Sequence, residues 1–190
     1  MTQLIEITKK DFGVELDLRY STANNVCAQR LYKEPRCYLH QETAEKLRTA
    51  IKLAKKSGFR IKIFDGYRPL LVQQFMYDSF PVAEGEEGFI SNPENGAIPH
   101  CRGIAIDLTL LDENGEEIDM GSDFDEFSNL AFHDCDNISD IVKKNRITLL
   151  KIMTEAGFDF YSKEWWHYQL FQPRQYEIYQ NHNDLSNINK

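Results

Sequence analysis

The segment His100-Cys101-Arg102-Gly103-Ile104-Ala105-Ile106-Asp107-Leu108-Thr109-Leu110 places an acidic residue inside an otherwise apolar strand. Isoleucine and leucine alternate with Ala105, Asp107 and Thr109, which is the two-residue period of a β-strand. An ionised carboxylate at such a position is costly unless it is paired, hydrogen-bonded or bound to a metal. Asp107 is therefore a candidate functional residue, and His100 can approach it only if Gly103 lets the backbone turn closely.

A second cluster, Glu164-Trp165-Trp166-His167, again puts polar groups where burial is expected. A regular strand sends residues three apart to opposite faces, so a bulge or a strand end must displace Glu164 or His167. Two imidazoles, one carboxylate and an open fourth position are the usual arrangement of a catalytic zinc ion, whereas structural zinc sites have four protein ligands and favour cysteine. On the residues alone, satisfied core histidines and surface ion pairs remain an equally good interpretation.

The rest of the sequence predicts one α+β domain over residues 1–190, with a mainly antiparallel central sheet flanked by helices. Apolar residues three and four apart predict helices over residues 41–57 and 137–156, and Pro69 opens a shorter helix through residue 78. Alternation and aromatic content predict strands over residues 14–18, 59–63, 103–110 and 164–171. Residues 80–99 are expected to form a surface loop, and the polar tail 181–190 is expected to fray.

Composition excludes several classes of function. A net charge of −8 gives no electrostatic footprint for nucleic acid. No apolar run approaches the roughly 18–20 residues of a membrane span, and residues 1–12 lack the pattern of a signal peptide, so we expect a soluble, cytoplasmic protein. Four cysteines stand far apart with no C-x-x-C pair, which favours free thiols. Nothing in the charge pattern indicates a protein partner.

Three motifs together resemble the zinc D-alanyl-D-alanine dipeptidases of the vancomycin-resistance type, in the Hedgehog/DD-peptidase superfamily. They are Asp65-Gly66-Tyr67-Arg68-Pro69, the segment His100 to Leu110 quoted above, and Glu164-Trp165-Trp166-His167-Tyr168. The similarity extends from about Val14 to Phe171. It implies the fold of that superfamily, one Zn²⁺ per chain and a small dipeptide as substrate.

The resemblance also implies roles for individual residues. His100, Asp107 and His167 would bind zinc, and Glu164 would act as general base and then general acid. Arg68 would stabilise the oxyanion that forms at the scissile carbonyl, a role that suits a fixed guanidinium. The alternative for Arg68 is a turn arginine paired with an acidic neighbour such as Asp65.

Two further positions resemble substrate-binding residues of the family. The segment Asp119-Met120-Gly121-Ser122-Asp123-Phe124-Asp125 looks like the one whose last aspartate pairs with the free ammonium of the dipeptide. The alternative for Asp125 is a solvated acidic loop that also contains Asp123 and Glu126. Residues 18–25 resemble the N-terminal segment of the family, in which Tyr20 would line the pocket.

The chain departs from the family pattern at Ile98, where the family usually has serine, so a hydrogen bond to the substrate would be lost there. Cys101 stands where serine is common; because consecutive strand residues point apart, we do not expect it to be a ligand or a nucleophile. If accessible, it would make the protein sensitive to thiol reagents.

The sequence thus predicts hydrolysis of D-alanyl-D-alanine, or a close D,D-dipeptide, in cell-wall precursor or dipeptide turnover. The alternatives are a D,D-carboxypeptidase or an L-alanyl-D-glutamate endopeptidase acting on longer wall peptides, and a non-catalytic zinc-binding module. Glu164 and Arg68 speak against the last alternative, because a binding module needs neither.

Overall fold

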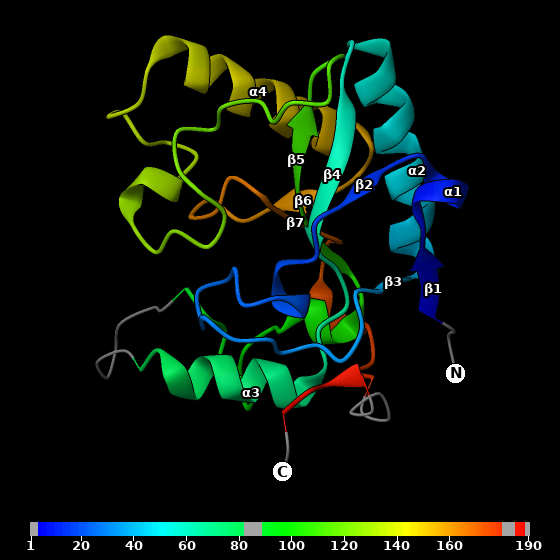
Figure 1. Cartoon of the computed structure of the whole chain (residues 1–190), viewed down its shortest axis with the longest axis vertical. Coiled ribbons are helices and arrows are strands. Elements are labelled where there is room, and N and C mark those ends of the chain that lie inside the picture. Colours follow the sequence, from blue (N-terminus) through cyan, green and yellow to red (C-terminus); the bar gives the residue numbers. More distant parts are fainter. Residues whose placement is uncertain (1–3, 82–88, 180–184, 189–190) are drawn as a thin grey trace.

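The computed structural model describes residues 4–81, 89–179 and 185–188, and in these ranges the chain forms two sheets and four α-helices (Figure 1). The larger sheet has the strand order β2 (Glu15–Leu16), β4 (Arg60–Asp65), β5 (Ala105–Leu111), β7 (His167–Gln169) and β6 (Asp159–Phe160). The smaller sheet pairs β1 (Leu4–Ile7) with β3 (Cys37–His40) in antiparallel fashion.

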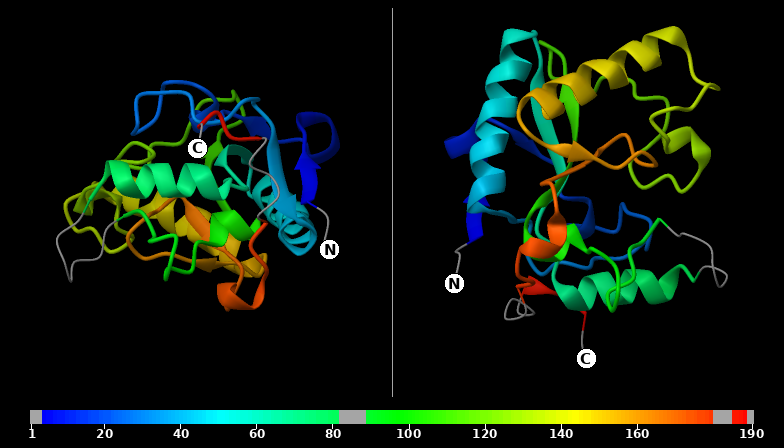
Figure 2. Two further views of the ribbon diagram at one scale, coloured as in Figure 1. Left: turned by 90° about the horizontal axis from the view of Figure 1, so that it is seen from below. Right: turned by 180° about the vertical axis from the view of Figure 1, so that it is seen from behind.

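The two long helices lie against the larger sheet and against each other. They are α2 (Gln41–Lys56), which contacts β4, and α4 (Asp140–Glu155), which contacts β6. The shorter helices are α1 (Lys9–Phe12) and α3 (Leu70–Ser79), and α3 lies at the end of the molecule opposite to α4 (Figures 1 and 2). The apolar stripe predicted for residues 41–57 is buried as expected, since Ala44, Leu47 and Ala54 are at most 4% exposed.

The α+β class is confirmed, but the prediction of a mainly antiparallel sheet needs correction because the sheet is mixed. β2 pairs parallel to β4, while β4, β5, β7 and β6 pair antiparallel in turn. The physical reason is the crossover: the chain leaves β2, passes through β3 and α2, and returns to β4 from the same end. The sequence patterns of β2, α2 and β4 are local and do not show that β2 and β4 become neighbours in the sheet.

Two other sequence expectations differ from the structure. Residues 164–171 contain only the short strand β7, and Glu164 lies in the turn before it. The strand end that the sequence required therefore brings Glu164 to the side of His167, with Oε2 3.8 Å from Nδ1 of that ring. Residues 185–188 of the tail are not frayed: Ser186 forms a β-bridge with Tyr32 and is 2% exposed. The rest of the tail, 181–184 and 189–190, lies outside the described residues.

The larger sheet places three polar residues directly opposite one another on neighbouring strands, and this row positions the site. Asp107 on the central strand β5 stands opposite Asp65 of β4 and opposite His167 of β7. The register shift between Ile63 and Asp65 creates this row, because regular alternation would place Asp65 on the face of Ile63. A bulge in β4 therefore moves a carboxylate to the face of the sheet that carries Asp107.

All four cysteines are free, as the sequence predicts. Among the described residues, no helix combines the length and the apolar character that crossing a bilayer requires.

Candidate active site

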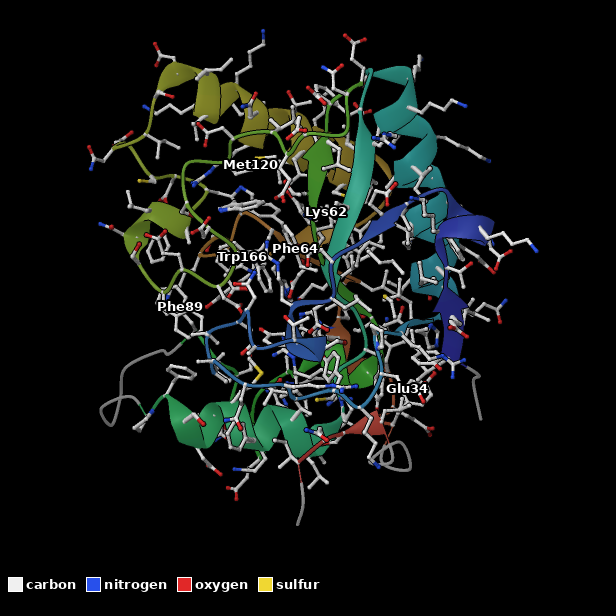
Figure 3. The ribbon with its side chains drawn as sticks, in the orientation of Figure 1. Glu34, Lys62, Phe64, Phe89, Met120 and Trp166 are labelled. Atoms are coloured by element: carbon white, nitrogen blue, oxygen red, sulfur yellow. The ribbon has the colours of Figure 1, made fainter. Side chains whose placement is uncertain are left out.

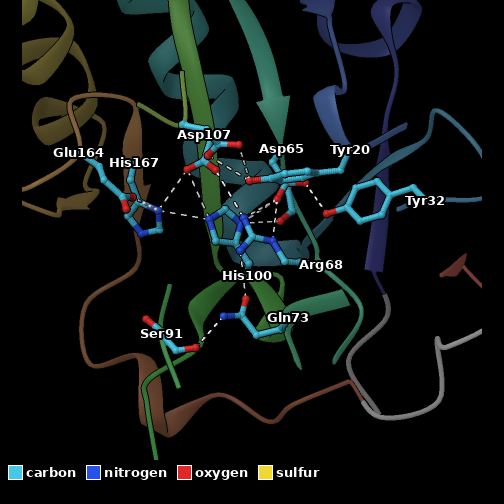
Figure 4. A network of polar contacts seen from close by, with 12 residues as sticks. Tyr20, Tyr32, Asp65, Arg68, Gln73, Ser91, His100, Asp107, Glu164 and His167 are labelled. Atoms are coloured by element: carbon cyan, nitrogen blue, oxygen red, sulfur yellow. Dashed lines mark hydrogen bonds and ion pairs between the residues drawn. The ribbon is translucent and has the colours of Figure 1, made fainter. Parts of the chain in front are cut away.

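Two histidines and one aspartate, from three different elements, form the centre of the site (Figure 4). His100 lies in the 3₁₀ turn Pro99–Arg102, Asp107 in β5 and His167 at the first residue of β7. Gly103, with φ of +66°, ends the 3₁₀ turn and leads the chain back into β5. A Cβ at Gly103 would come within 2.9 Å of the backbone nitrogen of His40, so only glycine fits this turn.

The three side chains direct one ligand atom each to a common point. Nε2 of His100 lies 3.2 Å from Nδ1 of His167, and Oδ1 of Asp107 lies 3.4 Å and 3.1 Å from these two nitrogens. A tetrahedral zinc site with bonds of about 2.0–2.1 Å has ligand atoms about 3.3 Å apart. The spacing of the three atoms therefore matches a tetrahedral ion of this size.

Hydrogen bonds on the outer sides of the two rings fix which nitrogens are free. Nδ1 of His100 is 2.7 Å from the carbonyl oxygen of Gly66, which can only accept, so Nδ1 carries the proton. Nε2 of His167 is 3.0 Å from Oε1 of Gln169, to which it donates. Three lone pairs then converge on one buried point and repel each other unless a cation lies between them. The residues present fit a zinc ion.

The pKa values of two carboxyl groups at this centre, those of Asp107 and Glu164, are strongly shifted. Burial would raise the pKa of Asp107, but the facing His100 and His167 hold that pKa well below its usual range. Burial also raises the pKa of Glu164, to about 7, against the opposing influence of His167. Oε2 of Glu164 lies 3.8 Å from Nδ1 of His167, close to the ligand atoms without being one of the three. A carboxyl with a pKa near neutrality is suited to proton transfer.

The guanidinium of Arg68 is held on several sides. Nε and Nη2 donate to Oδ2 of Asp65 at 3.1 Å and 3.0 Å, and Nη1 donates to Oε1 of Gln73 at 3.0 Å. Asp65 in turn accepts a hydrogen bond of 2.7 Å from the hydroxyl of Tyr32. The pairing of Arg68 with Asp65, which the sequence offered as the alternative to a role in the site, is thus present, yet Arg68 also lines the cavity. Among the described residues, three of the five N–H groups of this guanidinium have a hydrogen-bond acceptor, which leaves two for a ligand.

Asp125 and Tyr20 meet on another wall of the site. The hydroxyl of Tyr20 donates to Oδ2 of Asp125 at 2.8 Å, and the Tyr20 ring lies 5.0 Å below the Arg68 guanidinium carbon. Burial raises the pKa of Asp125 to about 8, although the hydrogen bond from Tyr20 opposes this. Asp125 adopts a left-handed backbone with φ of +62°, an unusual conformation that concentrates at functional sites.

One cavity of about 270 Å³ is lined by all seven residues that the sequence nominated. They are Tyr20, Arg68, His100, Asp107, Asp125, Glu164 and His167. The volume lies just below the range of about 300–1,000 Å³ that is typical for ligand pockets, so it suits a small ligand. Residues absent from the sequence prediction also line it, including Gln73, Gln169, Phe89 and Phe127. Gln169 had a signal in the sequence, because it stands two residues after His167 on the same strand face.

The two positions that depart from the family pattern are both buried. Ile98 lines the cavity with φ of +40°, a rare conformation for a β-branched residue. Cys101 is fully buried, and burial raises the pKa of its thiol to about 12, so we do not expect reagents to reach it. The reason given for excluding Cys101 as a ligand was wrong, since His100 and Cys101 lie in a 3₁₀ turn rather than a strand.

Comparison with known proteins gives consistent results. Residues 2–186 match the model of a peptidase family described as D-ala-D-ala dipeptidase. The D-alanyl-D-alanine dipeptidase of Escherichia coli is 33% identical over 177 residues, which cover 93% of this chain and 89% of the relative. Enzymes of the same name from Enterococcus faecium and Enterococcus faecalis are 33% and 32% identical, and each alignment covers 83% of this chain and 86% of the relative.

Proposed function

The chain belongs to the D-Ala-D-Ala dipeptidase family of metallopeptidases, and from this premise we propose that it hydrolyses D-alanyl-D-alanine, or a close D,D-dipeptide, with zinc as its metal. The observation that carries the proposal is the convergence of three lone pairs, from His100, Asp107 and His167, at tetrahedral spacing inside a cavity of dipeptide size. Glu164 and Arg68 line the same cavity, and a non-catalytic zinc-binding module would need neither.

In this proposal His100, Asp107 and His167 hold the ion, with ring orientations fixed by Gly66 and Gln169. A bound zinc ion polarises the scissile carbonyl and lowers the pKa of a coordinated water to about 7. Glu164 takes the proton from the attacking water and passes it to the leaving amine. Its raised pKa, about 7, suits both steps, because the group must accept and release a proton near neutral pH.

Arg68 stabilises the negative charge that develops on the scissile carbonyl, and Asp125 binds the ammonium group of the dipeptide. The two free N–H groups of Arg68 donate to the carbonyl oxygen as negative charge develops on it. Asp65 and Gln73 hold the guanidinium still, so little reorganisation is needed at that moment. Asp125, aligned by Tyr20, pairs with the free ammonium of the dipeptide. A blocked N-terminus has no such charge and gains nothing from this carboxylate.

The test is to incubate the purified zinc-loaded protein with free D-alanyl-D-alanine and, separately, with an N-acylated tripeptide ending in D-alanyl-D-alanine. We expect release of free D-alanine from the dipeptide and little or none from the blocked peptide. Turnover of the blocked peptide alone would contradict the dipeptidase assignment and support a carboxypeptidase.

A further inference from the structure

One charged residue stands in the apolar stripe of α4. Val142, Leu149 and Met153 are buried on the face of α4 that packs into the core, and Arg146 occupies the same face at 2% exposure. A buried guanidinium is costly unless its donors are satisfied. Within the described part of the chain, Arg146 makes no ion pair, and the partners of its nitrogens are backbone carbonyl groups. Another reason must therefore account for an arginine at this position.

All three nitrogens of Arg146 bind one segment, residues 119–132, which we call the Asp125 loop. Nε donates to the carbonyl of Met120 at 2.7 Å, Nη1 to that of Phe132 at 2.7 Å and Nη2 to that of Leu130 at 2.6 Å. Figure 3 shows Met120 beside α4. The rigid fork of a guanidinium can reach three carbonyls that point in different directions, whereas a lysine ammonium acts from a single point. Both ends of the loop that carries Asp125 are thus fastened to one side chain.

The same loop is also joined to the segment that carries Glu164. Between Leu130 and Phe132, two of the three residues whose carbonyls Arg146 binds, the carbonyl of Ala131 accepts a hydrogen bond of 3.0 Å from the backbone N–H of Trp165, next to Glu164. The indole N–H of Trp165 donates to the hydroxyl of Ser122 at 2.9 Å, earlier in the loop. Asp125 and Glu164, which lie about forty positions apart in the chain, are therefore on segments that are both connected to Arg146.

We propose that Arg146 is a positioning residue for the reaction: it fixes the Asp125 loop to α4 and, through Trp165, holds Glu164 at the cavity. The inference rests on the proposed function, because it assigns Asp125 and Glu164 to substrate binding and proton transfer. What indicates a role beyond stability is the place of the acceptors, because the carbonyls of Leu130 and Phe132 flank the carbonyl of Ala131 that binds the N–H of Trp165.

The test compares Arg146→Lys with Leu149→Ala in the zinc-loaded protein. Leu149 is fully buried about one turn further along α4, so its truncation weakens the helix packing but leaves the three hydrogen bonds of Arg146 in place. We expect Arg146→Lys to retain zinc, to raise KM and to lower kcat, with a combined loss of about 100-fold in kcat/KM, the cost typical of a displacement near 1 Å. Leu149→Ala should lower the thermal midpoint but leave both constants within about twofold of wild type at temperatures where it is folded.

A second readout does not depend on catalysis. The chain has two tryptophans, and both lie near the Asp125 loop. The indole of Trp165 donates a hydrogen bond to Ser122, and the ring centroid of Trp166 lies 5.4 Å from that of Phe124. Arg146→Lys should therefore increase acrylamide quenching of their fluorescence, and Leu149→Ala should not. Wild-type kinetics and unchanged quenching in Arg146→Lys, or equal effects of the two substitutions, would overturn the inference. Absence of dipeptide turnover in the wild type would instead contradict the proposed function and leave the quenching comparison decisive for Arg146.

Hydrogen exchange on the unaltered protein keeps the inference testable if Arg146→Lys does not fold. The amide of Trp165 should exchange at a rate similar to that of the amides in the middle of α4. The reason is that Arg146 of α4 binds the carbonyls on both sides of Ala131, whose own carbonyl accepts the hydrogen bond of the Trp165 amide. Much faster exchange at Trp165 than in α4 would overturn the role of Arg146.

Discussion

Replacing Asp125 by asparagine removes one negative charge from the cavity while leaving its surroundings in place. Asparagine tolerates the left-handed backbone at this position, where φ is +62°, so no strain is added. The amide oxygen can still accept the hydrogen bond that Tyr20 donates to the carboxylate. What disappears is the charge that would face the ammonium of the dipeptide. A hydrogen bond to a charged group contributes about 1.5–3 kcal/mol, which corresponds to a loss of roughly 10- to 100-fold in kcat/KM.

The assay is steady-state release of D-alanine from D-alanyl-D-alanine by the zinc-loaded protein, measured from pH 5.5 to 9. Burial raises the pKa of Asp125 to about 8, and a cation bound in the same cavity lowers it. Because the ammonium pairs with the ionised carboxylate, kcat/KM of the wild type should rise with pH at or below about pH 8. In Asp125→Asn the rise of kcat/KM with pH that comes from Asp125 should disappear. The rise that comes from ionisation of Glu164 should remain, at or below about pH 7, because a nearby cation lowers the pKa of Glu164. Asp123→Asn, an exposed change in the same loop, is the matched control. Unchanged kcat/KM in Asp125→Asn, or an equal loss in Asp123→Asn, would refute the reasoning.

Three further predictions follow from the same geometry. Glu164→Gln should retain zinc, measured by plasma mass spectrometry, and lower kcat by about 100- to 10,000-fold, because it loses the proton acceptor; full activity would contradict the proposed base. Gln169→Ala removes the acceptor that orients His167 and should weaken zinc binding by about 10- to 100-fold in competition with a chelator, whereas unchanged affinity would show that this contact has no such role. Asp125→Asn should melt at a higher temperature than the wild type at pH 8 when both are metal-free. The folded chain keeps a proton on Asp125 that the unfolded chain releases above about pH 4, so wild-type stability falls as pH rises from about 4 to 8, and equal melting temperatures at pH 8 would speak against the raised pKa.

The sequence predicts the elements whose patterns are local. The apolar stripe of α2 and the alternation in β5 need no information from distant residues, and both elements form where expected. Asp107 could be recognised for the same reason, since a carboxylate in an apolar strand is conspicuous in any context. Gly103 likewise signalled a tight turn, and its positive φ makes that turn.

Long-range pairing could not be predicted in the same way. The parallel position of β2 depends on the crossover through α2, and the row that joins Asp65 to Asp107 depends on a bulge in β4 that no local pattern marks. Tyr32 reaches Asp65 from a loop whose sequence shows no regular period. The tail around Ser186 is polar, yet it is held by backbone pairing with Tyr32, which polarity does not reveal.

Arg146 had a signal in the sequence that resembles the one at Asp107. A charged residue within the apolar stripe of a helix must find partners in the interior, just as a carboxylate in an apolar strand must. The identity of those partners, three carbonyls of the Asp125 loop, depends on tertiary structure and was not accessible from the sequence.

The central claim is that His100, Asp107 and His167 hold a single catalytic zinc ion. The most direct measurement is the metal content of the purified, unaltered protein, determined together with that of His167→Ala. We predict one zinc per chain in the unaltered protein and loss of the metal in His167→Ala, because two remaining ligands bind zinc weakly. A different stoichiometry in the unaltered protein, or zinc retained in full by His167→Ala, would contradict the account.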